Sequence, residues 1–241
     1  MPYIEEKCIA GKTIEIERKY SSRYKKKGIT RGKNKKPTTE EQKEINNRMA
    51  EKKLRRKINA NFGEGDYHLV LNFRPEERPK TKQEAKKQIE NFIRSLRKEY
   101  REQNMELKYI HVIEQGKNGA MHHHLVINEI DPKTISKAWK FGRININPLD
   151  ETGQYAKLAS YLIKYTSKVI GTDRAIYGRR WNESKNLKEP VVEKRIVKEK
   201  GWYREEAKAP KGYYVQKESI AKGICPYSGY PYFKYTLVKL E

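Results

Sequence analysis

The sequence predicts an α+β fold in which helices pack on an antiparallel β-sheet, and three observations support this prediction. Between about residues 65 and 170, short runs rich in β-branched and aromatic residues alternate with amphipathic helical patterns. Two neighbouring strand-like runs are joined by a short segment that contains Gly116 and Gly119, which favours an antiparallel pair. The order is strand, helix, strand, strand, helix, strand, helix, which is the split βαβ arrangement. We therefore expect a ferredoxin-like antiparallel sheet covered by helices, with extensions at both ends.

The individual elements follow from local patterns of polarity. Runs dominated by apolar and β-branched residues predict four strands, at 67–73, 107–113, 121–128 and 143–146. Helical spacing of apolar residues predicts three helices, at 81–102, 131–139 and 154–170. The first of these helices has one apolar stripe, made of Ala85, Ile89, Phe92, Ile93, Leu96 and Tyr100.

Both ends of the chain are expected to extend this core. Residues 4–9 and 13–16 alternate about Gly11-Lys12, which predicts a small hairpin. A capping-box pattern opens a helix from Thr39 to about Asn59. Its outer face is expected to carry the basic residues Lys52, Lys53, Arg55, Arg56 and Lys57. The last 70 residues are rich in aromatics, which favour two or three edge strands on the domain and could alternatively stack on bases.

These patterns divide the chain into three expected domains. The first is an N-terminal hairpin, arm and helix (1–62), the second is the central domain (63–190), and the third is an aromatic-rich C-terminal extension (191–241).

The charge of the chain indicates a polyanionic partner. Lys and Arg outnumber Asp and Glu by 54 to 31, which gives a net charge of +23, far more than solubility requires. Nucleic acid is favoured over a membrane surface, because no basic amphipathic helix carries Trp or Phe opposite its charges. From Arg18 to Lys36 the chain has ten Lys or Arg and no acid, so this arm is expected to follow a phosphate backbone. The side chains expected to contact DNA are Arg23, Lys25, Lys26, Lys27, Lys157, Lys168, Arg179 and Arg180.

Several classes of protein are disfavoured by the sequence. Cys8 and Cys225 are far apart and fit neither a metal spacing nor a disulfide framework, which suits a reducing compartment. No signal peptide, lipidation site or apolar run of spanning length is visible, so a cytoplasmic protein is expected. Gly11-Lys12-Thr13 resembles a phosphate-binding loop, but that loop needs a glycine where Glu6 stands. We therefore expect no nucleotide cofactor and no membrane partner.

The most informative segment runs from Glu114 to Ile127 and contains three of the five histidines of the chain. Because residues i and i+2 share one face of a strand, His122 and His124 point one way and His123 points the other. Two imidazoles on a stiff strand, with Glu114 from the preceding strand, can hold a divalent metal ion, and such mixed ligands suit Mn²⁺ or Mg²⁺. The alternative is one core histidine with the others exposed. The same ligand set would suit Fe(II) in an oxygenase, but the charge and the strand pattern argue against that class.

A second informative segment is the helix that carries Tyr161 and Tyr165. These tyrosines are one turn apart and share a face, and Lys164 lies three residues after the first of them. A tyrosine hydroxyl that faces the histidines could attack phosphorus in line, while a metal ion and lysines withdraw charge from the phosphate. Phenol has a pKa of about 10, so a phosphotyrosine would keep a usable leaving group. The alternative is that both tyrosines serve only in packing.

Together these segments resemble the HUH endonucleases, and among them the rolling-circle replication initiators of plasmids and small single-stranded DNA phages. The His-hydrophobe-His motif of the family matches 122–124, with a histidine as an unusual middle residue, and its Tyr-x-x-Lys motif matches 161–164. Tyr165 fills the place of the second tyrosine that some members have. Glu114 stands where many members place a third metal ligand, and the strand 69–73 resembles their first motif. The resemblance covers about residues 65–190.

The resemblance implies an HUH endonuclease fold and a metal-dependent nickase for single-stranded or hairpin origin DNA. Such an enzyme stays attached to the 5′ end of the cut strand through a phosphotyrosine and leaves a free 3′-hydroxyl as a primer. It implies Tyr161 as the first nucleophile and Lys164 as a phosphate-holding residue, and it leaves open whether Tyr165 also acts. It further implies a plasmid or phage element in a bacterial cell, with a host helicase and polymerase as partners. A transposase or mobilisation relaxase is the nearest alternative, and a non-catalytic nucleic-acid-binding protein is a more distant one.

Overall fold

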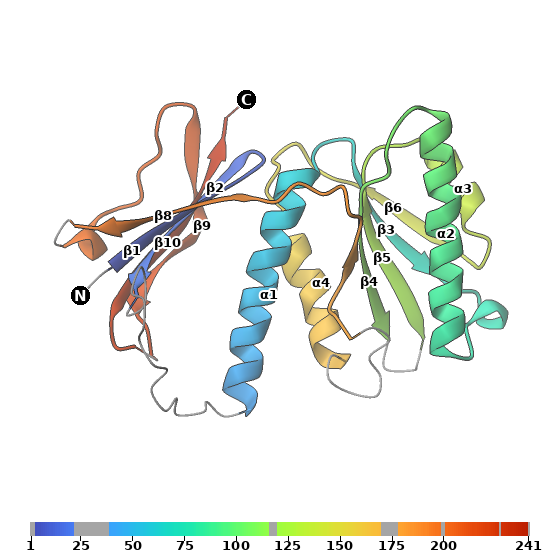
Figure 1. Ribbon diagram of the computed structural model, residues 1–241, viewed down its shortest axis with the longest axis horizontal. Helices are drawn as coiled ribbons and strands as arrows, with labels where there is room; N and C mark the ends of the chain where they lie inside the picture. The colour runs from blue at the N-terminus through green and yellow to red at the C-terminus, as the bar shows by residue number, and fades with distance from the viewer. Residues whose placement is uncertain are drawn as a thin grey trace. The chain divides into compact units, whose positions relative to one another are not determined.

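The structure, a computed structural model, describes residues 3–21, 39–115, 120–169, 178–198, 201–226 and 228–240 (Figure 1). The chain divides into two compact units, one formed by residues 1–45 with 189–241 and the other by residues 46–188. Each unit contains a five-stranded sheet whose strands pair antiparallel. The predicted α+β fold class is therefore confirmed.

The unit of residues 46–188 has a sheet with the strand order β6-β3-β5-β4-β7. Its strands are β3 (Tyr67–Asn72), β4 (Tyr109–Gln115), β5 (Met121–Ile127), β6 (Ile144–Pro148) and β7 (Asn182–Glu183). Its helices are most of α1 (Thr39–Asn61), the short 3-10 helix η1 (Pro75–Glu77), α2 (Lys82–Glu102), α3 (Pro132–Ala138) and α4 (Ala156–Val169). The segment from β3 to β6 has the split βαβ order that the sequence predicted.

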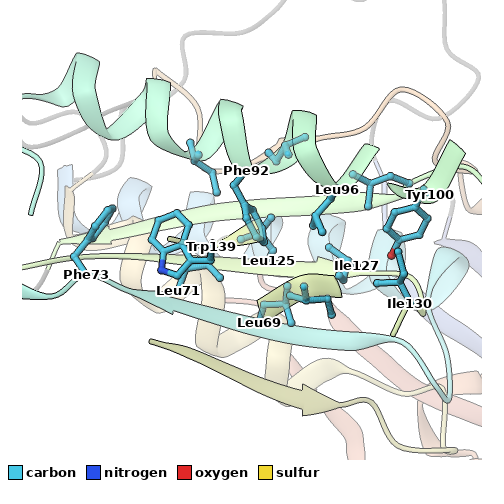
Figure 2. Close-up of a cluster of buried hydrophobic side chains, with 14 residues drawn as sticks. Leu69, Leu71, Phe73, Phe92, Leu96, Tyr100, Leu125, Ile127, Ile130 and Trp139 are labelled. Atoms are coloured by element: carbon cyan, nitrogen blue, oxygen red, sulfur yellow. The ribbon is translucent and has the colours of Figure 1, made fainter. Parts of the chain in front are cut away.

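Helices α2 and α3 cover one face of this sheet (Figure 1). Thr81 caps α2, because its hydroxyl accepts a hydrogen bond from the backbone N of Glu84 at 3.1 Å. The predicted apolar stripe of α2 is buried along its whole length. Figure 2 shows Phe92, Leu96 and Tyr100 of α2 directed at Leu125 and Ile127 of β5. Burial of each such large side chain stabilises the fold by about 2 kcal/mol.

The opposite face of the sheet is packed against α4 and the second half of α1. Ala159, Leu162 and Ile163 of α4 join Leu54 and Ile58 of α1 in one buried cluster with residues of β4 and β5. Because this half of α1 packs against the sheet, two of the basic residues that were expected on its outer face are buried.

Arg56 and Lys57 are not on an outer face of α1 but are buried, with exposures of 9% and 3%. Lys57 lies three residues after Leu54 and next to Ile58, so it belongs to the stripe that faces the sheet. Its ammonium group makes an ion pair of 3.3 Å with the Glu183 carboxylate of β7. Fewer basic residues of α1 are therefore exposed than the sequence predicted.

The other unit joins the two ends of the chain in one sheet. Its strands are β1 (Tyr3–Ala10), β2 (Thr13–Tyr20), β8 (Val191–Val197), β9 (Tyr213–Ile224) and β10 (Pro231–Lys239), in the order β8-β1-β2-β10-β9. The predicted hairpin about Gly11 is confirmed, and this glycine has the positive φ of 57° that a tight turn requires. A core around Trp202 of the 3-10 helix η2 (Trp202–Arg204), Phe233 and Leu237 lies on this sheet.

Of the described strands in the last 70 residues, only β7 lies at an edge of the central sheet, whereas β8, β9 and β10 join the sheet of the N-terminal hairpin. Strand β8 pairs with β1, and β10 pairs with β2. The sequence had assigned these two ends to separate extensions, because pairing between segments so far apart leaves no local pattern. Among the helices in the described ranges, none combines the length and the apolarity that crossing a bilayer requires.

Candidate active site

The register of the central strands brings the predicted metal ligands onto one face of the sheet, the face that packs against α4. His122 lies directly opposite Glu114 of β4 and directly opposite Asn72 of β3. His124 occupies the next row along β5, and His68 of β3 lies one row beyond it. His123 points to the other face, where it is fully buried, as the two-residue period of a strand predicted.

Hydrogen bonds connect these side chains into a network. Nε2 of His124 lies 3.2 Å from Oε2 of Glu114, and Nδ1 of the same ring lies 3.3 Å from Nε2 of His68. Nδ1 of His122 lies 2.7 Å from Oδ1 of Asn72. Because an amide oxygen only accepts, the proton of His122 is on Nδ1 and its Nε2 carries a lone pair. Strand β3 thus orients both histidines of β5 through one ring nitrogen each.

His68 and Asn72 were not among the residues selected from the sequence. The available signal was their spacing, since His68, Val70 and Asn72 alternate along a predicted strand and must share a face. The sequence could not indicate that this face would be the one occupied by His122 and His124, because the pairing of β3 with β5 is a long-range contact.

The two tyrosines of α4 lie over the same histidine. The ring centroid of His124 is 5.4 Å from that of Tyr161, in an edge-to-face arrangement, and 5.8 Å from that of Tyr165, in a stacked one. The tyrosine rings are 4.7 Å apart. Tyr161 is 39% exposed, so part of its side chain is open to solvent. The structure therefore brings together both tyrosines, His124 and Glu114, as the sequence had suggested.

The electrostatics of this cluster favour a bound cation. Burial lowers the pKa of His124 to about 3 and that of His68 to about 4, and burial together with the charge of Arg78 lowers the pKa of His122. All three imidazoles are therefore neutral at pH 7, which is the form that binds metal ions. Burial, a hydrogen bond with Tyr165 and the charge of Glu114 raise the pKa of Tyr161 to about 12. A phenolate at this position therefore needs positive charge nearby.

His122, His124 and Glu114 have side chains that can bind a divalent ion, but their positions do not match a complete metal site. In the described part of the chain, no three His, Cys, Asp or Glu side chains have metal-binding geometry. Two ligands that are each about 2.1 Å from one ion, at nearly a right angle, lie about 3 Å apart. The Nε2 of His124 and the Oε2 of Glu114 are 3.2 Å apart, which matches this separation. When Nδ1 of His124 donates to His68, the Nε2 lone pair faces a carboxylate oxygen, and a cation would stabilise that arrangement.

The basic residues expected at the DNA surface have different positions. Lys157 and Lys164 are exposed on α4, and Arg179 is exposed. Arg180 is half-buried and donates a hydrogen bond of 2.6 Å from Nη2 to Oδ1 of Asn47 in α1. Outside the described residues lie Arg23, Lys25, Lys26, Lys27 and the side chain of Lys168. Arg78 was not predicted; it is exposed, and its charge reaches His122.

The segment that contains this cluster matches a known protein family model. Residues 66–170 match the family model described as replication-associated protein ORF2/G2P. The matched segment runs from β3 to the end of α4 and includes every residue of the network around His122 and His124. The match supports a replication-associated protein of the initiator type. Neither the curated proteins nor the solved structures include a match to the chain.

Proposed function

We propose that the protein initiates rolling-circle replication of a plasmid- or phage-type element by nicking single-stranded DNA with a tyrosine nucleophile. One observation carries this proposal. The rings of Tyr161 and Tyr165 lie over His124, which is hydrogen-bonded to Glu114 on one side and to His68 on the other. This arrangement combines a nucleophile with the donor set for a divalent ion on one face of a sheet.

His122, His124 and Glu114 would hold the ion, with Mn²⁺ or Mg²⁺ as the expected metals. When bound, the ion supplies positive charge that polarises a phosphate oxygen and favours an ionised phenol. Asn72 and His68 keep the two imidazoles in place through their Nδ1 atoms. Such outer hydrogen bonds fix the tautomer and the direction of a ligating histidine.

Tyr161 would perform the first step. Its oxygen forms a bond to phosphorus while the bond from phosphorus to the 3′ oxygen breaks, and the phenolic proton is passed on to the departing 3′ oxygen. The products are a 5′-phosphotyrosine and a free 3′-hydroxyl. Lys164, exposed on the same helix three residues later, would offset the charge of the phosphate.

Tyr165 would act in a second transfer. It is hydrogen-bonded to Tyr161, and its ring is stacked on His124. A second nucleophile would allow the protein to stay attached to one DNA end while it cuts the regenerated junction. A packing role for Tyr165 is the alternative.

The substrate would be single-stranded or hairpin DNA, because a stacked duplex hinders in-line attack on the backbone. The free 3′-hydroxyl would prime a host polymerase in the bacterial cytoplasm, and a host helicase would separate the strands. A transposase or a mobilisation relaxase would use the same chemistry. The match to replication-associated proteins favours the replication role.

The direct test is incubation of the protein with single-stranded oligonucleotides and Mn²⁺, followed by denaturing electrophoresis. We expect a covalent protein–DNA band that is lost in excess EDTA and lost when both tyrosines are changed to phenylalanine. Undiminished cleavage in EDTA would contradict the metal assignment. Absence of any covalent band with DNA from the element's own origin would contradict the nickase.

A further inference from the structure

The face of the sheet that carries the candidate active site extends onto the edge strand β6. Asn145 lies opposite Val70, and Asn147 lies opposite His68. The backbone N of Asn72 donates a hydrogen bond of 2.8 Å to the carbonyl oxygen of Arg143, which continues the same register by one residue. Since directly opposed residues share a face, Arg143, Asn145 and Asn147 lie on the side of the sheet that holds His122 and His124.

This part of the face is open, unlike the part over β4 and β5. Arg143, Asn145 and Asn147 are all exposed, whereas Val112 of β4 and Val126 of β5 are buried against the helices. The alternate residues of β6, Ile144 and Ile146, pack against the core on the other face. A polar strip therefore borders the candidate active site on the side opposite β4.

The strip is rigidly attached to the strand that orients the histidines. Nδ2 of Asn147 donates to the carbonyl oxygen of His68 at 3.2 Å. Gly142 packs so closely on β3 that a Cβ atom there would lie 2.1 Å from the carbonyl oxygen of Asn72. Within the described residues, the side chains of Arg143 and Asn145 have no hydrogen-bond or ion-pair partner. The backbone of this strip is fixed on β3, and the polar groups of Arg143 and Asn145 are available.

We propose that Arg143 and Asn145 bind bases of the single strand on one side of the scissile phosphate, and so set the sequence preference next to the nick. This inference rests on the proposed function. Neighbouring strands are about 4.8 Å apart, so β6 lies about 10 Å from β5 across the sheet. Stacked nucleotides are spaced by about 3.4 Å, which places this strip about two to three nucleotides from a phosphate at His122 and His124.

The chemistry of the strip suits DNA better than a protein partner. Arginine can donate two hydrogen bonds to the edge of guanine, and asparagine can donate one and accept one at the edge of adenine. A protein interface needs an apolar centre. On β3, the neighbours of this strip on the same face include only one aliphatic side chain, the half-buried Val70.

The test uses single-stranded oligonucleotides with a random segment, incubated with the full-length protein and Mn²⁺. Both products of each covalent capture are sequenced, so that base preferences on either side of the nick are obtained. We expect Arg143→Gln and Asn145→Ala to reduce the preference about tenfold at positions on one side of the nick and to leave the other side unchanged. Preferences equal to those of the unaltered protein on both sides would overturn the proposal.

Matched controls come from α2, which covers the other face of the sheet. Arg97→Gln removes the same charge from an exposed helix position, and Asn91→Ala removes the same amide. Both should retain the preferences of the unaltered protein. Thermal unfolding midpoints close to that of the unaltered protein would show that all four variants are folded.

Binding to the same oligonucleotides, measured by fluorescence anisotropy in the Tyr161→Phe background, separates this inference from the proposed function. We expect Arg143→Gln to weaken binding severalfold more than Arg97→Gln does. If no covalent product forms with any variant or with the unaltered protein, the nickase proposal fails. The binding comparison still tests whether Arg143 contacts the single strand. Equal affinities of Arg143→Gln and Arg97→Gln would overturn this inference.

Discussion

The two faces of the central sheet differ although the same strands build them, because, among the described residues, only the face towards α4 combines an apolar cluster with a network of polar side chains. On the face below α2 and α3, Leu69, Leu71, Leu125 and Ile127 form a closed apolar core (Figure 2). On the other face, the same strands carry ionisable and amide side chains that meet the tyrosines of α4. The two-residue period of a strand thus places the polar network on one face and the leucines on the other within one run of sequence.

Histidine illustrates the difference between the faces. On the apolar face, Nε2 of His111 is 3.0 Å from Nδ1 of His123, and both rings are fully buried. Phe73 and Trp139 contact His123, whose Nε2 has no hydrogen-bond partner among the described residues. His124, one residue further, is hydrogen-bonded at both nitrogens. Neighbouring histidines are therefore packed among aromatic rings on one face and joined to a polar network on the other.

The largest expected effect tests the tyrosines of the polar face. Tyr161→Phe removes only a hydroxyl and should lower covalent adduct formation on a single-site oligonucleotide by about a thousandfold or more. Tyr165→Phe should be nearly normal in that assay and defective in the second transfer that releases a circle. If Tyr165→Phe loses the adduct and Tyr161→Phe does not, the two roles are reversed.

The second prediction compares two proposed metal ligands of the polar face with their neighbour on the apolar face. His124→Ala and Glu114→Gln should weaken Mn²⁺ binding about a hundredfold, as measured by calorimetry, and should abolish nicking. Single-stranded DNA affinity should remain nearly intact, because it depends on the basic surface. His123→Leu, on the same strand, should retain Mn²⁺ affinity. Equal losses for His123→Leu and His124→Ala would contradict the separation of the two faces.

A smaller effect is expected for the positioning residue His68. His68→Ala removes the partner of Nδ1 of His124 and should weaken Mn²⁺ binding about tenfold, with little change in the unfolding midpoint. His68→Gln can still bond to that nitrogen and should recover part of the affinity. If both variants bind Mn²⁺ as tightly as the unaltered protein, His68 has no role in orienting the ligand.

A prediction about stability, not about metal binding, concerns the buried histidine pair of the apolar face. Burial lowers the pKa of His111 to about 3, whereas an unfolded imidazole has a pKa of about 6.5. Below pH 6.5 the unfolded chain takes up a proton that the folded protein does not. Stability is therefore fully present above pH 6.5 and falls towards pH 3, by up to about 1.4 kcal/mol per pH unit for each such histidine.

The double variant His111→Leu/His123→Leu should remove this contribution. Between pH 7 and pH 5 the free energy of unfolding of the unaltered protein should decrease by about 2–4 kcal/mol more than that of the double variant. Urea denaturation in EDTA at both pH values measures the difference. An unchanged pH dependence would show that the pair can take up protons in the folded state.

By itself the sequence determined most elements of the central sheet and its covering helices, and the faces of several of them. The stripe of α2, the opposite directions of His123 and His124, and the shared face of Tyr161 and Tyr165 depend only on residues that are neighbours along the chain. Periods of 2 and 3.6 residues record such local geometry directly.

Only the tertiary structure decided which segments meet across long separations. The pairing of β3 with β5 brings His68 to His124 and Asn72 to His122, and the pairing of β1 with β8 joins the two ends of the chain. Tertiary packing also buries Lys57 beside Glu183, although the neighbouring residues in the sequence are strongly basic. Strand order and register result from contacts between distant side chains and from the closing of long loops, and no local pattern of polarity encodes them.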